Sequence, residues 1–335
     1  MDSSAAGLPE DAPLVALRRG PIVESVHRGR LLFCDPAGNV LDRTGDPDAY
    51  VYPRSSAKPF QALPLVLSGA ADAFGLTGEE LAVACASHNA EAPHLAAVRS
   101  LLEKAGLSEN DLQSGAHPPM HGPEAAELER AGEEPRPIHG NCSGKHAGML
   151  AVCVHEGLDT GGYRNPGHPL QRRILELVVE VCDLRDDEPL VAGDDCGVPT
   201  FAMPLKGLAT GFARLATGEG LSDEVAAAAE RLGRAMRAHP FLVAGTGRFD
   251  TRRMEATDLI AKGGAEGVFA AGSATGDAGG WGLAVKISDG AGRAVRPAAV
   301  AALGRRGVEG LGDGSRDGVK RDLHGEVVGE IGPFV

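Results

Sequence analysis

The stretch IVESVHRGRLLFC at residues 22–34, followed by the turn DPAGN at residues 35–39, decides the fold class of this chain. Its β-branched and apolar residues predict a strand, and the Asp-Pro-Ala-Gly-Asn turn predicts a reversal into a second strand at residues 40–41. A hairpin of this kind favours an antiparallel sheet. The sequence predicts further strands at residues 191–192, 268–271, 283–288 and 326–331.

Helical patterns fill the middle of the chain. Thr77-Gly78-Glu79-Glu80 is a capping-box sequence ahead of an apolar run at residues 81–86. Further helices are predicted at residues 56–69, 92–105, 145–155, 169–182, 222–238 and 298–303, and an ordered loop at residues 114–138. Strands toward both ends with helices between them predict an α+β fold, in which the terminal strands share one antiparallel sheet with flanking helices and the middle forms a helical lobe. Residues 1–12 are expected to form a flexible tail and residues 13–335 a single domain, because no repeat or linker divides them.

The composition excludes several classes of protein. The 335 residues carry a formal net charge of −13, and only 4% are aromatic. An acidic chain repels phosphate, which argues against nucleic acid and against anionic membrane surfaces as partners. No apolar run reaches the ~20 residues that a membrane-spanning helix needs. Residues 1–11 lack the basic and apolar regions of a signal peptide, so we expect a cytoplasmic protein.

The six cysteines fall into two groups. In a reducing compartment they are not expected to form disulfides. Cys142 and Cys196 lie in glycine-rich polar turns, which makes them the candidates for chemistry. The other four lie in apolar stretches and are expected to be buried small hydrophobic residues: Cys34, Cys85, Cys153 and Cys182.

Ser55 and Lys58 form the first candidate catalytic pair. Residues three apart at the start of a helix lie on the same face, so the two side chains are expected to be neighbours. A lysine shielded from water has a lowered pKa and supplies a neutral base that can take the serine proton. The pattern is common by chance, and an N-cap serine beside a solvated lysine is the alternative where no other motif accompanies it.

Two further elements follow this pair in the order found in serine β-lactamases and penicillin-binding proteins. Ser87-His88-Asn89 offers a Ser-x-Asn element, and Lys262-Gly263-Gly264 offers a Lys-x-Gly element. The ordered trio predicts two Ser/Lys pairs facing one pocket, whereas a helix end and a plain turn are the alternatives for the two elements taken singly. The short interval from Ser55 to Ser87, and glycine at position 263 where Thr or Ser is usual, weaken the interpretation as an antibiotic hydrolase.

The sequence Asn141-Cys142-Ser143-Gly144-Lys145-His146 begins a predicted helix. It is not a phosphate-binding loop, because the spacing from Gly140 to Gly144 is one residue short and histidine replaces Ser or Thr. Cys142 and Cys196, with one or two nitrogen ligands from this segment, are a donor set that suits zinc. A pair of reduced buried thiols is the alternative.

Together these motifs resemble the L-asparaginase II family, the rhizobial-type or class 3 asparaginases. The similarity extends from about residue 14 to the end of the chain. It is carried by six segments: VESVHRG (23–29), RSSAKPFQ (54–61), ASHN (86–89), HGNCSGKH (139–146), GDDCG (193–197) and KGGAEG (262–267).

The resemblance implies a fold similar to serine β-lactamases and glutaminases, hydrolysis of L-asparagine to L-aspartate and ammonia, and a homodimer. It also implies an active site of two tandems, Ser55 with Lys58 and Ser87 with Lys262. The implied zinc ligands are Cys142, Lys145 and Cys196, with water completing the site. The residues expected to contact the substrate are Arg54, His88, Asn89, Asp194 and Gly263.

In the mechanism that we expect, Ser55 attacks the side-chain amide with Lys58 as base, ammonia leaves, and water hydrolyses the acyl-enzyme. Ser87 and Lys262 relay protons and hold the substrate, and zinc positions it. Which serine attacks first stays open at this point. Three alternatives also stay open: a glutaminase with the same tandems, a β-lactam-binding enzyme, and a non-catalytic zinc-binding relative.

Overall fold

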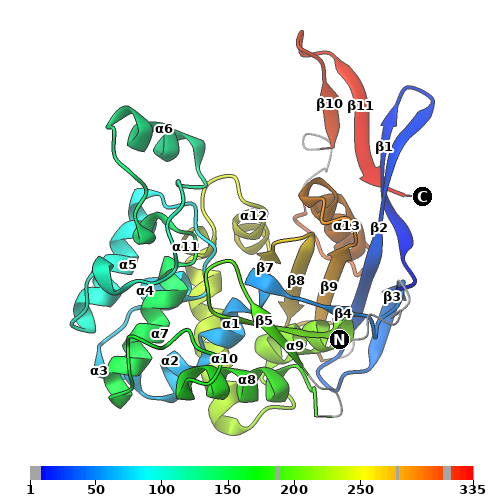
Figure 1. The fold of residues 1–335 in the computed structure, drawn as a ribbon. Coiled ribbons are helices and arrows are strands. Elements are labelled where there is room, and N and C mark those ends of the chain that lie inside the picture. Colours follow the sequence, from blue (N-terminus) through cyan, green and yellow to red (C-terminus); the bar gives the residue numbers. More distant parts are fainter. Residues whose placement is uncertain (1–8, 186–188, 277–278, 312–317, 335) are drawn as a thin grey trace, which may run out of the picture.

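One antiparallel sheet joins the two ends of the chain (Figure 1). The computed structural model describes residues 9–185, 189–276, 279–311 and 318–334. The strands of this sheet are β1 (Ala12–Arg19), β2 (Ile22–Cys34), β3 (Val40–Thr44), β7 (Ile260–Gly264), β8 (Val268–Ser273), β9 (Trp281–Ile287), β10 (Val319–Arg321) and β11 (Val327–Pro333). They pair in the order β10-β11-β1-β2-β9-β8-β7, and β3 pairs with β2. The N-terminal strands therefore lie between strands from the C-terminal part of the chain.

A helical lobe lies beside the sheet (Figure 1). Its elements are η1 (Arg54–Ala57), α1 (Lys58–Gln61), α2 (Leu63–Leu67), α3 (Ala70–Ala73), α4 (Gly78–Ala84), α5 (Ala92–Lys104), η2 (Glu109–Asp111), α6 (Gly122–Arg130), η3 (Pro137–His139), α7 (Ser143–Glu156), α8 (Pro169–Val181), α10 (Asp223–Ala238), α11 (Pro240–Val243) and α12 (Phe249–Ala256). Two helices pack on the sheet itself, α9 (Leu205–Thr217) and α13 (Gly292–Arg305). A small second sheet has the order β4-β6-β5, from Tyr50–Val51, Pro199–Pro204 and Leu190–Gly193.

The lobe and the sheet share one apolar core. Phe60 of α1 packs edge-on against Phe212 of α9, with the ring centroids 5.4 Å apart, and both side chains are buried. Aromatic pairs in this geometry add to the stabilisation that comes from burying their area. The contact fixes α1, which begins at Lys58, against the helix that covers the sheet.

Most of the predicted elements are confirmed. The strand at residues 22–34 is β2 with the same bounds, and it turns back into β3 at Val40. Thr77 and Glu80 form the predicted capping box at the start of α4. The terminal strands share one antiparallel sheet and the middle of the chain is a helical lobe, so the predicted α+β class is confirmed. All six cysteines are buried and free, as expected.

Three predictions need correction. Residues 114–138 are not only a loop, because they contain α6. The helix predicted at residues 56–69 is divided into η1, α1 and α2, since Pro59 and Pro64 each lack the N–H that a continuing helix requires and sit instead at helix starts. The tail predicted over residues 1–12 ends earlier, because Ala12 already belongs to β1, and residues 1–8 lie outside the described residues. Strand β1, helix α9 and helix α12 were not predicted.

In the part of the chain that the structure describes, no helix has both the length and the apolar character needed to cross a membrane.

The contact between α7 and α4 requires glycine at position 144. A Cβ at Gly144 would stand 2.1 Å from the carbonyl oxygen of Val83 in α4. Gly144→Ala must therefore separate the two helices, and we expect it to lower the free energy of unfolding by about 1–3 kcal/mol. Gly292→Ala, at the start of α13, is the matched control, because nothing lies within 4 Å of the added Cβ. Urea denaturation measures both variants, and equal stabilities would contradict the close contact.

Candidate active site

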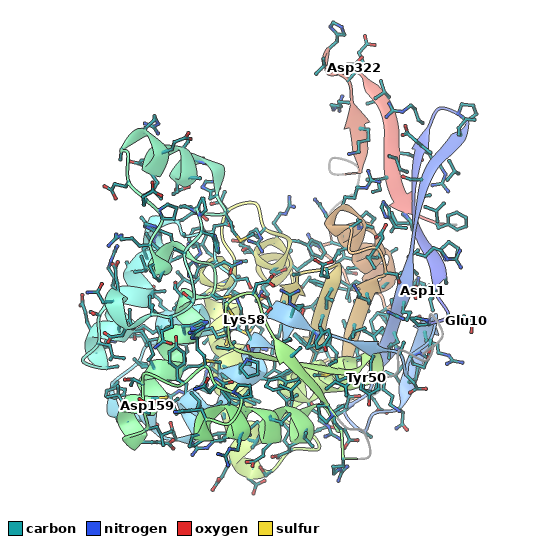
Figure 2. All side chains as sticks on the ribbon, in the orientation of Figure 1. Glu10, Asp11, Tyr50, Lys58, Asp159 and Asp322 are labelled. Atoms are coloured by element: carbon teal, nitrogen blue, oxygen red, sulfur yellow. The ribbon has the colours of Figure 1, made fainter. Side chains whose placement is uncertain are left out.

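Two buried lysines converge on the hydroxyl of Ser87. Lys58 Nζ lies 2.8 Å from Ser87 Oγ, and Lys262 Nζ lies 3.0 Å from the same oxygen. Both lysine side chains are fully buried, and Ser87 is nearly so. In Figure 2, Lys58 lies where the helical lobe meets the sheet. One hydroxyl therefore stands between two amines in a water-poor setting.

Three separate parts of the fold supply this group. Ser87 follows the C-terminal end of α4, Lys58 begins α1, and Lys262 lies on β7. The amine of Lys58 is also held by the carbonyl oxygens of Ala86 at 2.6 Å and Asn141 at 3.5 Å. Lys58 therefore links the ends of α1 and α4 to the turn before α7.

The segment around Ser55, from Pro53 to Ser56, contacts β7 directly. Ser56 Oγ donates to the carbonyl oxygen of Lys262 at 2.9 Å. A Cβ at Gly264 would stand 2.4 Å from the carbonyl oxygen of Pro53, so only glycine permits this approach. The second glycine of the predicted Lys-x-Gly element thus brings the Ser55 loop and Lys262 into one site.

Burial changes the charge state that each lysine prefers. Burial lowers the pKa of Lys58. Burial also lowers the pKa of Lys262 to about 8, while the carboxylate of Asp250 acts in the opposite direction. Removal from water disfavours the ammonium form, so proton transfer to or from these amines becomes accessible near neutral pH.

Ser55 is the more exposed of the two serines. It is half-buried, and among the described residues its hydroxyl has no protein hydrogen-bond partner. The structure thus gives Lys58 a hydrogen bond to Ser87 and none to Ser55, which differs from the predicted pairing of Ser55 with Lys58. Ser55 lies in the 3₁₀ turn η1 that leads directly into α1, and the amine of Lys58 is held instead by Ser87 Oγ and by the carbonyl oxygen of Ala86, beyond the end of α4.

Arg54, just before Ser55, has a left-handed backbone with φ of +52°. This conformation is costly for a residue with a Cβ and persists only where the surroundings hold it. Arg54 Nε donates to Asp194 Oδ1 at 2.7 Å, and its terminal nitrogen donates to Asp195. The turn after β5 therefore clamps the backbone that presents Ser55.

The predicted metal residues meet beside this site. Lys145 Nζ donates to Cys196 Sγ at 3.1 Å, and Cys142 and Cys196 are hydrogen-bonded to each other. This hydrogen bond and the charges of Lys58 and Lys145 hold the pKa of Cys142 well below its usual range. Burial lowers the pKa of Lys145, but the neighbouring thiols outweigh burial and raise it above its ordinary value.

The donor set at this place fits zinc. The amine of Lys145 and the sulfur of Cys142 both lie beside the sulfur of Cys196, and all three residues are buried. Among the described residues, the groups of three or more His, Cys, Asp and Glu side chains that are close enough to share an ion do not include Cys142 or Cys196, whereas Lys145 Nζ lies 3.1 Å from Cys196 Sγ. Zinc prefers thiolate and nitrogen ligands, and each must lose its proton to bind.

His88 and Asn89, two of the predicted substrate contacts, are engaged by protein atoms. Both ring nitrogens of His88 have partners, since Nε2 pairs with Ser143 Oγ at 2.9 Å and Nδ1 accepts from the N–H of Ala90. The side-chain amide of Asn89 contacts the carbonyl oxygen of Thr246 at 3.1 Å. In this structure the two residues hold the loop after Ser87, and their contact with substrate stays a prediction.

The sequence did not single out Asp250. This buried residue lies in the first turn of α12, and its Oδ2 lies 3.4 Å from Lys262 Nζ and 3.0 Å from the N–H of Gly263. The only signal in the sequence was indirect, namely glycine at position 263 where Thr or Ser is usual.

A comparison with protein families identifies the family of this chain. A model of the L-asparaginase II family matches residues 15–332. This chain belongs to the L-asparaginase II family. The family places it among the amidohydrolases, which agrees with a site built from hydroxyls and buried amines.

Several solved structures resemble this family member at low identity. A β-lactamase from Mycobacterium bovis is 17% identical over 84% of this chain and 95% of that chain, with a TM-score of 0.42. The Bacillus subtilis glutaminase YbgJ, in covalent complex with 5-oxo-L-norleucine, is 12% identical over 87% of this chain and 92% of that chain, with a TM-score of 0.38. Mglu is 14% identical over 88% of this chain and 72% of that chain, with a TM-score of 0.38. A comparison with curated proteins found no match.

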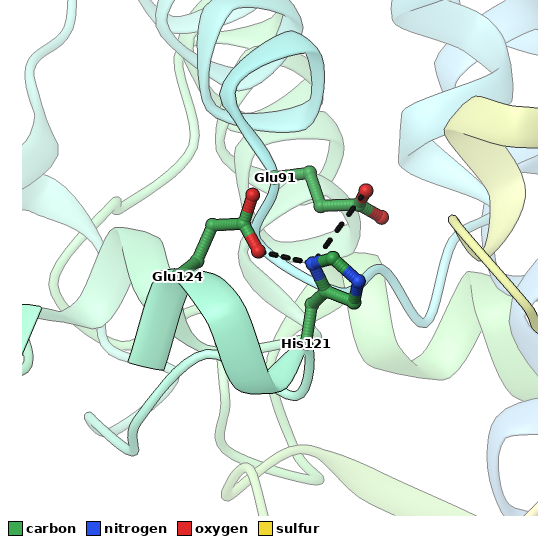
Figure 3. A group of neighbouring side chains, drawn as sticks. All are labelled: Glu91, His121 and Glu124. Carbon is green, nitrogen blue, oxygen red and sulfur yellow. Dashed lines mark hydrogen bonds and ion pairs between the residues drawn. The ribbon is translucent and has the colours of Figure 1, made fainter. Parts of the chain in front are cut away.

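A cluster of charged side chains links the start of α6 to the loop after Ser87 (Figure 3). His121 contacts Glu124, and its Nδ1 lies 3.8 Å from Glu91 Oε2. Glu91 also accepts hydrogen bonds from the N–H of Thr246 at 2.8 Å and from its hydroxyl at 2.6 Å. The carboxylate of Glu91 therefore ties the loop after Ser87 to two other segments that border the site.

The clamp on Arg54 yields a prediction about stability. Asp194→Asn removes the buried charge that holds the guanidinium, and we expect the free energy of unfolding to fall by about 1–3 kcal/mol at neutral pH. Asp195→Asn is the matched control on the same guanidinium, because the side chain of Asp195 is 90% exposed. The control is expected to stay within ~0.5 kcal/mol of the wild type.

The same pair of variants has a pH signature. Burial raises the pKa of Asp194, but Lys145 and Arg54 outweigh it and hold this pKa below its usual value. A lowered pKa stabilises the fold above the unfolded value of about 3.9, and this stabilisation is lost as the pH falls through the folded value. The difference between wild type and Asp194→Asn should therefore shrink below about pH 4. An equal difference at pH 7 and pH 3 in urea denaturation would contradict the clamp.

Proposed function

We propose that this protein hydrolyses L-asparagine to L-aspartate and ammonia through a serine acyl-enzyme. The observation that carries the proposal is the convergence of Lys58 and Lys262 on Ser87, together with the more exposed Ser55 on the turn that leads into Lys58. Family membership supports amide hydrolysis as the reaction.

Ser55 is the proposed nucleophile. A nucleophile must reach the carbonyl carbon of a bound substrate, and Ser55 is half-buried whereas Ser87 is 3% exposed. Ser87 is already engaged by two amines, which suits a hydroxyl that passes protons between them and the substrate.

The proposed reaction has two stages. Ser55 Oγ bonds to the amide carbon and its proton goes to Lys58, while Lys262 gives a proton through Ser87 to the departing nitrogen, so that the C–N bond breaks and ammonia leaves. Water then adds to the acyl carbon and its proton returns to Lys262. Lys58 returns its proton to Ser55 as the ester bond breaks and aspartate is released.

Glutamine hydrolysis is the second candidate substrate reaction. The two Ser/Lys pairs can act in the same way on the side-chain amide of either amino acid, and the two substrates differ by one methylene. A pocket distinguishes one methylene by only about 1–3 kcal/mol, so both amides belong in the first assay.

The test is ammonia release from L-asparagine and L-glutamine by the purified chain. We expect turnover with a higher kcat/KM for asparagine, and loss of at least about 10³-fold in kcat for Ser55→Ala. Ser68→Ala, at the end of α2 and outside the site, is the control and should keep wild-type activity. Full activity of a folded Ser55→Ala variant would remove Ser55 as the nucleophile, and turnover of neither amide would overturn the proposal.

We also propose that Cys142, Lys145 and Cys196 hold zinc. The contacts among the two sulfurs and the amine support this donor set. When bound, the metal supplies positive charge that positions the substrate. The homodimer implied by the resemblance and the cytoplasmic location expected from the composition and the N-terminal residues are part of the same proposal.

Metal content tests the zinc site. We expect about one zinc per chain in the wild type, and loss of most of it in Cys142→Ser and in Cys196→Ser, because two thiolates provide most of the affinity. Cys153→Ala is the control, since this buried thiol lies within α7 away from Lys145. Elemental analysis of dialysed protein gives the result, and equal zinc content in all four proteins would contradict the assignment.

A further inference from the structure

Asp250 is a buried carboxylate with two partners that both belong to β7. It is 4% exposed and lies in the first turn of α12. Its Oδ2 lies 3.4 Å from Lys262 Nζ and accepts the N–H of Gly263 at 3.0 Å. A buried charge requires a partner of opposite charge and hydrogen bonds, and Asp250 has both on adjacent residues of one strand.

Glycine at position 263 makes room for this carboxylate. A Cβ at Gly263 would stand 3.0 Å from Asp250 Oδ1 and 3.5 Å from Oδ2. A side chain of Ser or Thr at this position would therefore press on the carboxylate. The space that a hydroxyl occupies in a K-T-G element is here bordered by the charge of Asp250.

Four ionisable side chains from the elements packed around Lys262 influence its charge: Asp250, Lys58, Arg248 and Cys85. Asp250 favours the ammonium, whereas Lys58 of α1 and Arg248 before α12 disfavour it. Cys85, at the end of α4, is the fourth group, and burial raises the pKa of its thiol to about 12, so it is neutral. Asp250 thus supplies the negative charge that opposes both burial and the positive charge of Arg248.

We propose that Asp250 is a positioning residue that keeps Lys262 protonated and aimed at Ser87, so that Lys262 acts as the proton donor to the departing nitrogen. The inference rests on the proposed function for its catalytic consequence. The pairing of Asp250 with Lys262, which sets the charge of Lys262, does not depend on the proposed function. It rests on the contacts of Asp250 alone.

The first test is Asp250→Asn, which keeps the shape and the acceptor for Gly263 but removes the charge. A carboxylate within a few ångströms favours a cation by about one pH unit or more. We therefore expect the pKa of Lys262 and the alkaline limb of kcat/KM to move to lower pH by about one unit. KM at the optimum should change little. Asp258→Asn, an exposed carboxylate on the connection between α12 and β7, is the matched control and should leave both unchanged.

The pKa of Lys262 is read directly, without activity, by NMR of chains labelled at the lysine side chains. Lys262→Arg identifies the resonance. If the wild type hydrolyses neither amide, the proposed function fails, yet the titration still decides whether Asp250 sets the charge of Lys262. Unchanged titration and an unchanged alkaline limb in Asp250→Asn would overturn the inference.

A second variant covers the case in which Asp250→Asn does not fold. Asp250→Ala combined with Gly263→Ser fills the space beside β7 with a neutral hydroxyl, and it should show the same shift to lower pH. Thermal unfolding checks that either variant is folded. The wild type alone is also decisive, because an unpaired buried lysine titrates near pH ~5–6, and a Lys262 resonance in that range would contradict a paired ammonium.

Discussion

The burial of two lysine amines against one serine hydroxyl is the constraint on which the site depends. An amine removed from water loses hydration that must be replaced by hydrogen bonds. Here the replacements come from Ser87 and from backbone carbonyl oxygens at Ala86, Asn141 and Gly263. Because these acceptors lie on different elements, the lysines can be satisfied only when the lobe and the sheet are assembled together.

Close backbone contacts make this assembly possible. Gly264 lets the segment around Ser55 lie on β7, and Gly144 lets the start of α7 lie on α4. Through these contacts Ser55, Lys262 and the Cys142 turn reach one place. Glycine is therefore required at these two positions, since a Cβ at either one would displace a segment of the proposed active site or of the proposed zinc site.

Local patterns predicted local structure well. Strand β2 and the capping box of α4 follow from neighbouring residues, and the structure confirms both. Helix α9 was missed because Gly207 and Gly211 interrupt its apolar pattern, although both glycines serve close packing against neighbouring segments. Strand β1 was missed because its evidence is its pairing with β11, near the other end of the chain. The sequence placed the four Ser and Lys residues in one site, but which amine bonds which hydroxyl depends on the meeting of α1, α4 and β7.

The contacts also separate the roles of the two amines. Lys262 is paired with the carboxylate of Asp250, whereas Lys58 is bound by the carbonyl oxygens of Ala86 and Asn141 and by Ser87. A neutral amine has two N–H donors and one lone pair, so Lys58 can donate to the carbonyl oxygen of Ala86 at 2.6 Å and to Ser87 Oγ at 2.8 Å and keep a lone pair for the proton of Ser55. An ammonium has no lone pair. A neighbouring carboxylate stabilises this charged form, as Asp250 does at Lys262. The same hydroxyl therefore faces a group suited to take a proton and a group suited to give one, which is the asymmetry that amide cleavage requires.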